Sequence, residues 1–268
     1  MRRGWILIVL MMLIAVPWRA QAAGPLYPVL DVDGGWLLGG VQDGKWLNAI
    51  TTARQLKGGE SYRLFSATAA LGQAKGSKPQ GDVPCENTRF VTLTPKPRNT
   101  DALGIGGTWN AQPRVPQKQA VTAAYRTAVS ELLKSKGIAR PEVNITAIWR
   151  VDLEGDGTTE VLLSATRLTS SESGSPQPSA RPGDYSLTLL RKVVNGKVQT
   201  TLLGSNFYPN GGDFVAPQVF SFGPILDANG DGRLEFLQRA EYYEGASSGL
   251  YRMVGNQPVL TLEDGCGV

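Results

Sequence analysis

The chain has 268 residues, which is enough for one large or two small domains with a proper hydrophobic core. It contains no histidine, and this excludes Ser-His-Asp and Cys-His catalysis together with nearly all zinc chemistry. The formal net charge is +4, but it falls to +1 when the three arginines of residues 1–23 are set aside. Such a balance lacks the strong basic footprint of a general nucleic-acid binder, so we expect no nucleic-acid partner.

The N-terminal residues have the three parts of a secretory signal peptide. Residues 1–3 supply a positive start, residues 5–16 are almost wholly apolar, and residues 20–22 form an A-x-A cleavage site. An apolar stretch of this length reaches only ~18 Å as a helix, short of the ~30 Å hydrocarbon core of a bilayer. We therefore predict that residues 1–23 are removed, that no membrane span remains, and that the protein is exported, either secreted or periplasmic. The alternative is an uncleaved amphipathic anchor.

Residues 24–94 predict a small N-terminal β subdomain of short strands and turns. Asp43-Gly44 is a hairpin-type turn between two of these strands. The following residues 95–115 are rich in Pro, Gly and Asn and indicate a linker, so that residues 95–141 form a linker plus a helix. The expected N-terminal strands are 27–30, 36–40, 45–47, 61–66 and 89–94, with a short helix at 48–57.

Residues 116–136 have the spacing of an amphipathic helix. Pro116 suits the first turn of this helix, and Gly137 suits its end. The apolar face expected from the spacing consists of Val121, Ala124, Tyr125, Ala128 and Leu132.

From residue 142 the apolar period changes to two, which is typical of half-buried strands. Two successive sets of four strands follow, and in each set an acidic loop joins the first pair and a tight glycine turn joins the last pair. Self-similarity of this size indicates a repeat. We predict a mainly β (α+β) fold: an N-terminal small β subdomain, one helix, and a two-repeat antiparallel β meander at 142–268. The strands expected are 143–151, 161–168, 185–194 and 197–203, then 218–226, 236–243, 250–254 and 258–262.

The two acidic loops follow the pattern D-x-[D/N/E]-G-D-G-x-x-E. Calcium is a hard cation that takes six to eight oxygen ligands, and oxygens at alternate positions of a tight loop can converge on it. Position 7 offers a backbone carbonyl and position 9 a closing carboxylate. The alternative is a pair of metal-free turns, because Asp, Asn and Gly are turn residues in any case. The candidate calcium ligands are Asp152, Glu154, Asp156, Thr158 and Glu160, and Asp227, Asn229, Asp231, Arg233 and Glu235.

A strand, an acidic loop of this pattern and a second strand resemble the calcium loops of FG-GAP/VCBS-type repeats, as in integrin-like β-propeller blades. The resemblance covers residues 143–262 and implies metal-ligand roles for the side chains at positions 1, 3, 5 and 9 of both loops. Two departures are visible: Glu154 is longer than the usual Asp or Asn, and Glu160 and Glu235 replace the commoner Asp. Two blades cannot close a propeller, and the N-terminal part resembles no family.

Cys85 and Cys266 are the two cysteines of the chain. In an exported protein an even number of cysteines favours a disulfide, here between the N-terminal part and the extreme C-terminus. The alternative is two free thiols.

These features predict an exported, calcium-stabilised binding or structural module without catalytic activity, whose partner is a protein or a carbohydrate. Long loops commonly carry binding sites, and the meander places several of them, including those at 204–216 and 244–248, at one end. The alternative function is an exported carboxylate-dependent hydrolase acting on polysaccharide, with Asp213, Glu241 and Glu244 as its acids. The alternative explanation for the aromatic residues of the candidate ligand surface is packing in the core. This surface consists of Phe207, Tyr208, Asp213, Phe214, Tyr243 and Glu244.

Overall fold

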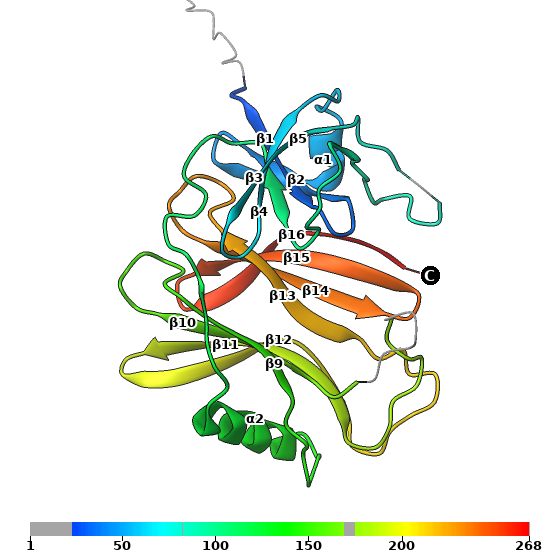
Figure 1. The fold of residues 1–268 in the computed structure, drawn as a ribbon, viewed down its shortest axis with the longest axis vertical. Helices are drawn as coiled ribbons and strands as arrows, with labels where there is room; N and C mark the ends of the chain where they lie inside the picture. The colour runs from blue at the N-terminus through cyan, green and yellow to red at the C-terminus, as the bar shows by residue number, and fades with distance from the viewer. Residues whose placement is uncertain (1–22, 82, 169–174, 268) are drawn as a thin grey trace, which may run out of the picture.

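The computed structural model describes residues 23–81, 83–168 and 175–267, so almost all of the predicted signal peptide lies outside the described residues. The described residues form sixteen strands and two helices, and the strands make three antiparallel sheets. The prediction of a mainly β fold is therefore confirmed. Figure 1 shows the sheets stacked in layers, with the longer helix at the far end of the stack from the N-terminal sheet. None of the helices formed by the described residues has the length and hydrophobicity of a membrane-spanning segment.

The first sheet is built from the N-terminal part of the chain, in the order β3-β2-β1-β7-β4-β5-β6. The predicted hairpin turn joins β2 and β3, with positive φ angles of 51° at Asp43 and 71° at Gly44. Helix α1 (Ala49–Ala53) begins where the Asn48 side chain accepts a hydrogen bond from the Thr51 N–H at 2.9 Å. The strands are β1 (Leu26–Asp31), β2 (Trp36–Gln42), β3 (Lys45–Asn48), β4 (Ser61–Phe65), β5 (Ala70–Gly76), β6 (Leu93–Thr94) and β7 (Leu103–Ile105).

Strand β7 lies within residues 95–115, the stretch whose composition indicates a linker. It pairs with both β1 and β4, so it occupies an interior position of the first sheet. Leu103 and Ile105 are completely buried on either side of Gly104. A three-residue strand is too short to show a periodicity, and its pairing is decided by contacts with residues far away in the sequence. The linker interpretation is wrong for these three residues.

The second sheet follows the order β12-β11-β10-β9-β8 and is covered on one face by helix α2 (Ala123–Ser135). The helix begins seven residues later than predicted, because residues 117–118 pair with β9 as a short strand. It buries Val129 and Leu133, so its buried face is rotated from the predicted one. The strands are β8 (Gln117–Lys118), β9 (Ile145–Val151), β10 (Glu160–Thr166), β11 (Asp184–Val194) and β12 (Lys197–Tyr208).

The third sheet is a four-stranded meander with the order β13-β14-β15-β16. The predicted loop at 244–248 is shorter than expected, because β15 begins at Gly245 and leaves residues 243–244 as the connection. Residues 204–208, also expected in a loop, extend β12. The strands are β13 (Val219–Leu226), β14 (Glu235–Tyr242), β15 (Gly245–Val254) and β16 (Gln257–Gly267).

The third sheet lies between the other two, and separate cores hold the layers together (Figure 1). Phe222, Phe236 and Met253 of the third sheet pack against Leu162 and Leu190 of the second. The other face of the third sheet packs against the first sheet, and α2 packs against the outer face of the second. Fully burying each large apolar side chain contributes about 1.5–3 kcal/mol, so these stacked cores stabilise the layered arrangement.

Candidate functional site

The two acidic loops lie side by side at one end of the stacked sheets. The Leu234 N–H donates to the Leu153 carbonyl at 2.8 Å, which joins the loops directly. The Arg114 guanidinium donates to the Asp152 carbonyl at 2.6 Å and to the Gly232 carbonyl at 2.8 Å. Arg114 belongs to the predicted linker, and the amino-acid composition of that stretch does not indicate that Arg114 bridges both loops.

The aspartate at position 1 accepts the same two glycine hydrogen bonds in both loops. The aspartate at position 1 accepts from the N–H at position 4 at 2.6 Å and from the N–H at position 6 at 2.9 Å in both loops. These donors are glycines with φ near +80°, a conformation that favours glycine. The first loop uses Asp152 with Gly155 and Gly157, and the second uses Asp227 with Gly230 and Gly232.

The glutamate at position 9 closes each loop from inside the protein. Glu160 accepts from the Leu153 N–H at 3.0 Å, and Glu235 accepts from the Ala228 N–H at 2.9 Å. Both glutamates are buried. Each loop is thus a turn organised around two carboxylates, one at each end.

A positive charge from β11 lies at the first loop. The Lys192 ammonium, from β11, forms an ion pair with Glu154 and lies 3.7 Å from Oε1 of Glu160. All three side chains are at least nine-tenths buried. Lys192 therefore supplies a cation at the carboxylates of positions 3 and 9.

The second loop has no such cation among the described residues: no lysine or arginine forms an ion pair with Asp227, Asp231 or Glu235. Burial, reinforced by the charges of Asp231 and Asp227, raises the pKa of Glu235 to about 8. Burial also raises the pKa of Asp227. A positive ion would relieve this accumulation of negative charge.

A metal centre also requires several ligand side chains gathered around one point. Within the described residues, no group of three or more Asp, Glu, Cys or His side chains is arranged to hold a metal ion. At position 7 the N–H groups of Thr158 and Arg233 donate to Asp156 and Asp231, at 2.7 and 2.8 Å. Asn229 donates to Asp231 at 3.0 Å. Calcium binding by either loop stays a prediction.

The six residues of the predicted ligand surface have different environments. Phe207 packs against the core under α2, with the Lys136 ammonium 5.8 Å from its ring centre, and Tyr208 is half-buried at the end of β12. Phe214 is 82% exposed and Tyr243 is 37% exposed. The remaining two, Asp213 and Glu244, are exposed. Phe207 is thus partly buried against the core, and ligand binding by these six residues stays a prediction.

A groove of about 680 Å³ lies over one face of the third sheet. Its walls come from β12, from the end of β16 and from residues 87–88 of the N-terminal part. Sequence reasoning missed this groove because its lining is drawn from three separate parts of the chain. The residues with aromatic, amide or acidic side chains are Asn87, Gln218, Phe220, Gln238, Tyr242, Tyr251, Glu263 and Asp264.

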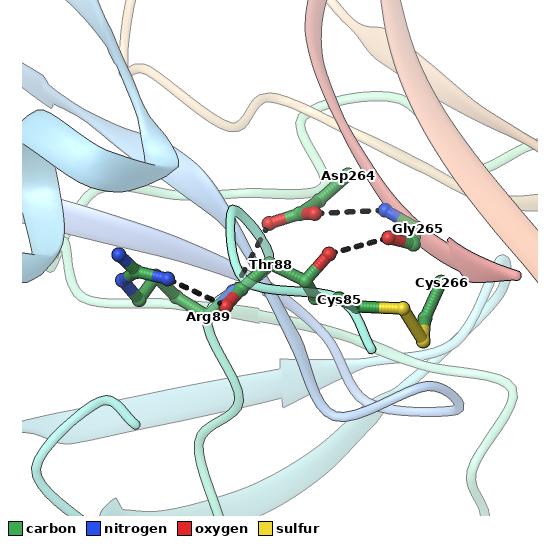
Figure 2. The surroundings of a disulfide bond; sticks show 6 residues. All are labelled: Cys85, Thr88, Arg89, Asp264, Gly265 and Cys266. Atoms are coloured by element: carbon green, nitrogen blue, oxygen red, sulfur yellow. Dashed lines mark hydrogen bonds between the residues drawn. A yellow bond between two sulfur atoms is a disulfide. The ribbon is translucent and has the colours of Figure 1, made fainter. Parts of the chain in front are cut away.

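The predicted disulfide between Cys85 and Cys266 is confirmed, and it holds one wall of the groove in place (Figure 2). Beside it, Thr88 donates to the Gly265 carbonyl, and the Asp264 carboxylate accepts from the N–H groups of Gly265 at 2.8 Å and Arg89 at 3.4 Å. Burial raises the pKa of Asp264, while these hydrogen bonds act in the opposite direction. Asp264 of β16 thus binds the segment at residues 85–89, which the disulfide also attaches to this strand.

The acids proposed for a hydrolase are not gathered into one cavity. Glu241 lines a cavity of about 560 Å³ beside the groove, on the side facing the first sheet. Asp213 lies in the connection before β13, and Glu244 lies in the turn between β14 and β15. Neither of them lines that cavity.

Comparisons of this chain with protein-family models, with curated proteins and with solved structures found no match.

Proposed function

We propose that this protein is an exported, calcium-stabilised module that binds an oligosaccharide in the groove of the third sheet. The groove carries this proposal, because aromatic rings, amides and carboxylates together line a concavity of about 680 Å³. Pockets of roughly 300–1,000 Å³ with a few placed polar groups are typical of small-ligand sites.

The chemistry of the lining favours a sugar. Tyr251 stacks on Phe236 with an interplanar angle of 6°, so its ring is held in a fixed orientation. Aromatic rings contact the apolar faces of sugars, while Gln218 and Glu263 supply polar groups for hydroxyls. Glu263 is exposed in the groove. A neutral or amino-sugar oligomer suits this mildly acidic surface better than an acidic one.

The binding test compares the groove with the predicted long-loop surface. Calorimetric titration with neutral, amino-sugar and uronic-acid oligosaccharides identifies a binding class for the wild-type protein. Glu263→Ala and Gln218→Ala should each weaken that binding by roughly tenfold, since a hydrogen bond to a charged or neutral group contributes about 0.5–3 kcal/mol. Phe214→Ala is the matched control, because it removes an exposed aromatic ring from the predicted long-loop surface, outside the groove.

Three outcomes decide between the functions. Loss of binding in the groove variants supports the groove, whereas loss in Phe214→Ala and retention in Glu263→Ala would place the ligand at the long loops. Release of reducing ends from polysaccharide, lost in Glu241→Gln, would support the hydrolase alternative instead.

The calcium part of the proposal concerns the loop at 227–235. Its oxygen-bearing side chains are Asp227, Asn229, Asp231 and Glu235, and no described lysine or arginine forms an ion pair with any of them. This donor set fits a hard divalent cation, as the FG-GAP/VCBS resemblance implies. The loop at 152–160 fits calcium less well, because Lys192 already pairs with Glu154 there. The proposed role of the ion is to stabilise the fold.

Calcium should raise the melting temperature of the protein. With a Kd on the order of 10⁻⁴–10⁻³ M, ~10 mM calcium stabilises by roughly 1.4–2.7 kcal/mol. Asp231→Ala should abolish most of the increase, while Asp156→Ala, the same change at the equivalent position of the first loop, should preserve it. Equal melting temperatures of the wild-type protein in EDTA and in 10 mM calcium would contradict the proposal.

A further inference from the structure

A second cavity lies on the opposite face of the second sheet from the third sheet, in the angle between α2 and strands β10 and β11. Its volume is about 380 Å³. Ala128 and Leu132 of the helix form one wall, and Leu163 and Leu189 of the sheet form the other. Leu163 and Leu189 are at most 3% exposed, so their side chains form an aliphatic floor.

This cavity exists because α2 covers only part of the sheet. The helix buries Val129 and Leu133, and Ala128 and Leu132 are half-buried at its flank. Arg191 follows Leu189 by two residues on β11, so both side chains lie on the same face of the sheet. The cavity therefore runs from aliphatic side chains under the helix to a guanidinium beyond its edge.

The Arg191 side chain has no hydrogen-bond or ion-pair partner among the described residues. Its Nε atom is buried and makes no hydrogen bond, and no described carboxylate forms an ion pair with it. A buried donor without an acceptor is costly, and hydrogen bonds between a guanidinium and a carboxylate are among the strongest in proteins. Glu131 also lines the cavity, but its side chain is exposed, so solvent screens its charge.

We propose that this cavity binds an aliphatic carboxylate of the fatty-acid type. The alkyl chain lies between Ala128, Leu132 and the two floor leucines, and the carboxylate pairs with Arg191. Thr200 is the cross-strand partner of Arg191 and also lines the cavity, so its hydroxyl is placed to donate to the same carboxylate. The volume lies within the range of small-ligand pockets. This site is independent of the groove and of the acidic loops.

The test uses 11-(dansylamino)undecanoic acid as a fluorescent probe and displaces it with dodecanoate, decanoate, octanoate or dodecanol. We expect saturable binding to the wild-type protein and a roughly fourfold loss of affinity for each methylene removed from the competitor. Arg191→Met should weaken dodecanoate by at least roughly tenfold while leaving dodecanol within about twofold, because only the carboxylate uses the charge.

Arg150→Met is the matched control. Arg150 and Arg191 are the two cross-strand neighbours of Val161 on the same face of the sheet, but Arg150 does not line this cavity. Its substitution removes the same charge and should change dodecanoate affinity by less than about twofold. Ala128→Phe should block the probe while the melting temperature shows that the variant is folded.

Absence of saturable probe binding by the wild-type protein would overturn the proposal. Equal weakening by Arg191→Met and Arg150→Met would also overturn it, since that result indicates a general attraction of anions to the sheet face. A chain-length dependence that survives in Ala128→Phe would place the apolar contact elsewhere and would have the same consequence.

Discussion

At the scale of single residues, charge compensation differs between the two acidic loops. Lys192 pairs with Glu154 and lies 3.7 Å from Glu160 in the first loop, while Glu235 of the second loop is buried with a pKa raised to about 8. Burial lowers the pKa of Lys192, and the nearby charge of Arg233 lowers it further. A charged lysine in this position depends on its carboxylate partners, just as they depend on it.

Replacing Lys192 by methionine should lower the free energy of unfolding by about 3–5 kcal/mol, because the change leaves Glu160 buried without a positive partner. Urea unfolding followed by tryptophan fluorescence measures this loss. Lys197→Met, an exposed lysine on the neighbouring strand, should stay within about 0.5 kcal/mol of the wild-type protein. Equal stability of the two variants would show that the buried ion pair has no net effect.

At the scale of secondary-structure elements, helix α2 ends as its sequence predicts. Gly137 has a φ of +90°, its N–H donates to the Lys134 carbonyl, and the Ile138 N–H donates to the Leu133 carbonyl. This pair of hydrogen bonds is a Schellman motif, and Ile138 and Leu133 are buried in the same core, which suits the apolar contact typical of that motif. The positive φ explains why a glycine stands at this point.

Gly137→Ala should destabilise the protein by about 1–2 kcal/mol, because a Cβ atom disfavours the left-handed conformation. Gly137→Asn should lie between the wild-type protein and the alanine variant, since asparagine tolerates this region better. Thermal unfolding of the three proteins gives the order. A stability of the alanine variant equal to that of the wild-type protein would mean that the helix can end one residue earlier without cost.

At the scale of the whole molecule, polar contacts and the disulfide attach the first sheet to the third. Asp31 of β1 is completely buried and accepts hydrogen bonds from Arg239 of β14 at 2.7 and 3.2 Å. Ser248 of β15 also donates to Asp31, and Arg239 makes a second ion pair with Asp101 at 2.6 Å. These contacts join residues more than 130 positions apart, so the first and third sheets should unfold as one unit.

Arg239→Met should lower the free energy of unfolding by about 3–5 kcal/mol, because Asp31 is then buried without its cation. The double variant Asp31→Asn with Arg239→Met should lose less than the sum of the two single variants, since their effects are coupled. Chemical unfolding of the four proteins provides the cycle. Additive losses would show that the two side chains act independently.

Local sequence determined most of the individual elements. The alternation of apolar residues predicts the strands of the second and third sheets, Asn195-Gly196 and Asp43-Gly44 have the positive φ angles of tight hairpin turns, and Gly137 ends the helix. These features depend on side-chain period and backbone conformation within a few residues, and both can be read from the sequence. The disulfide was predictable for a different reason, because only two cysteines are available.

Tertiary structure alone decided how these elements combine into sites. Nothing near Arg114 indicates that it bridges two loops, nothing near Lys192 indicates that it pairs with Glu154, and nothing near Leu103 predicts an interior strand. The groove and the α2 cavity are likewise lined by residues from separate strands and from a helix whose buried face is rotated from the predicted one. Such contacts depend on the order in which the sheets stack. Packing between segments far apart in the sequence sets that order, so no local periodicity in the sequence predicts it.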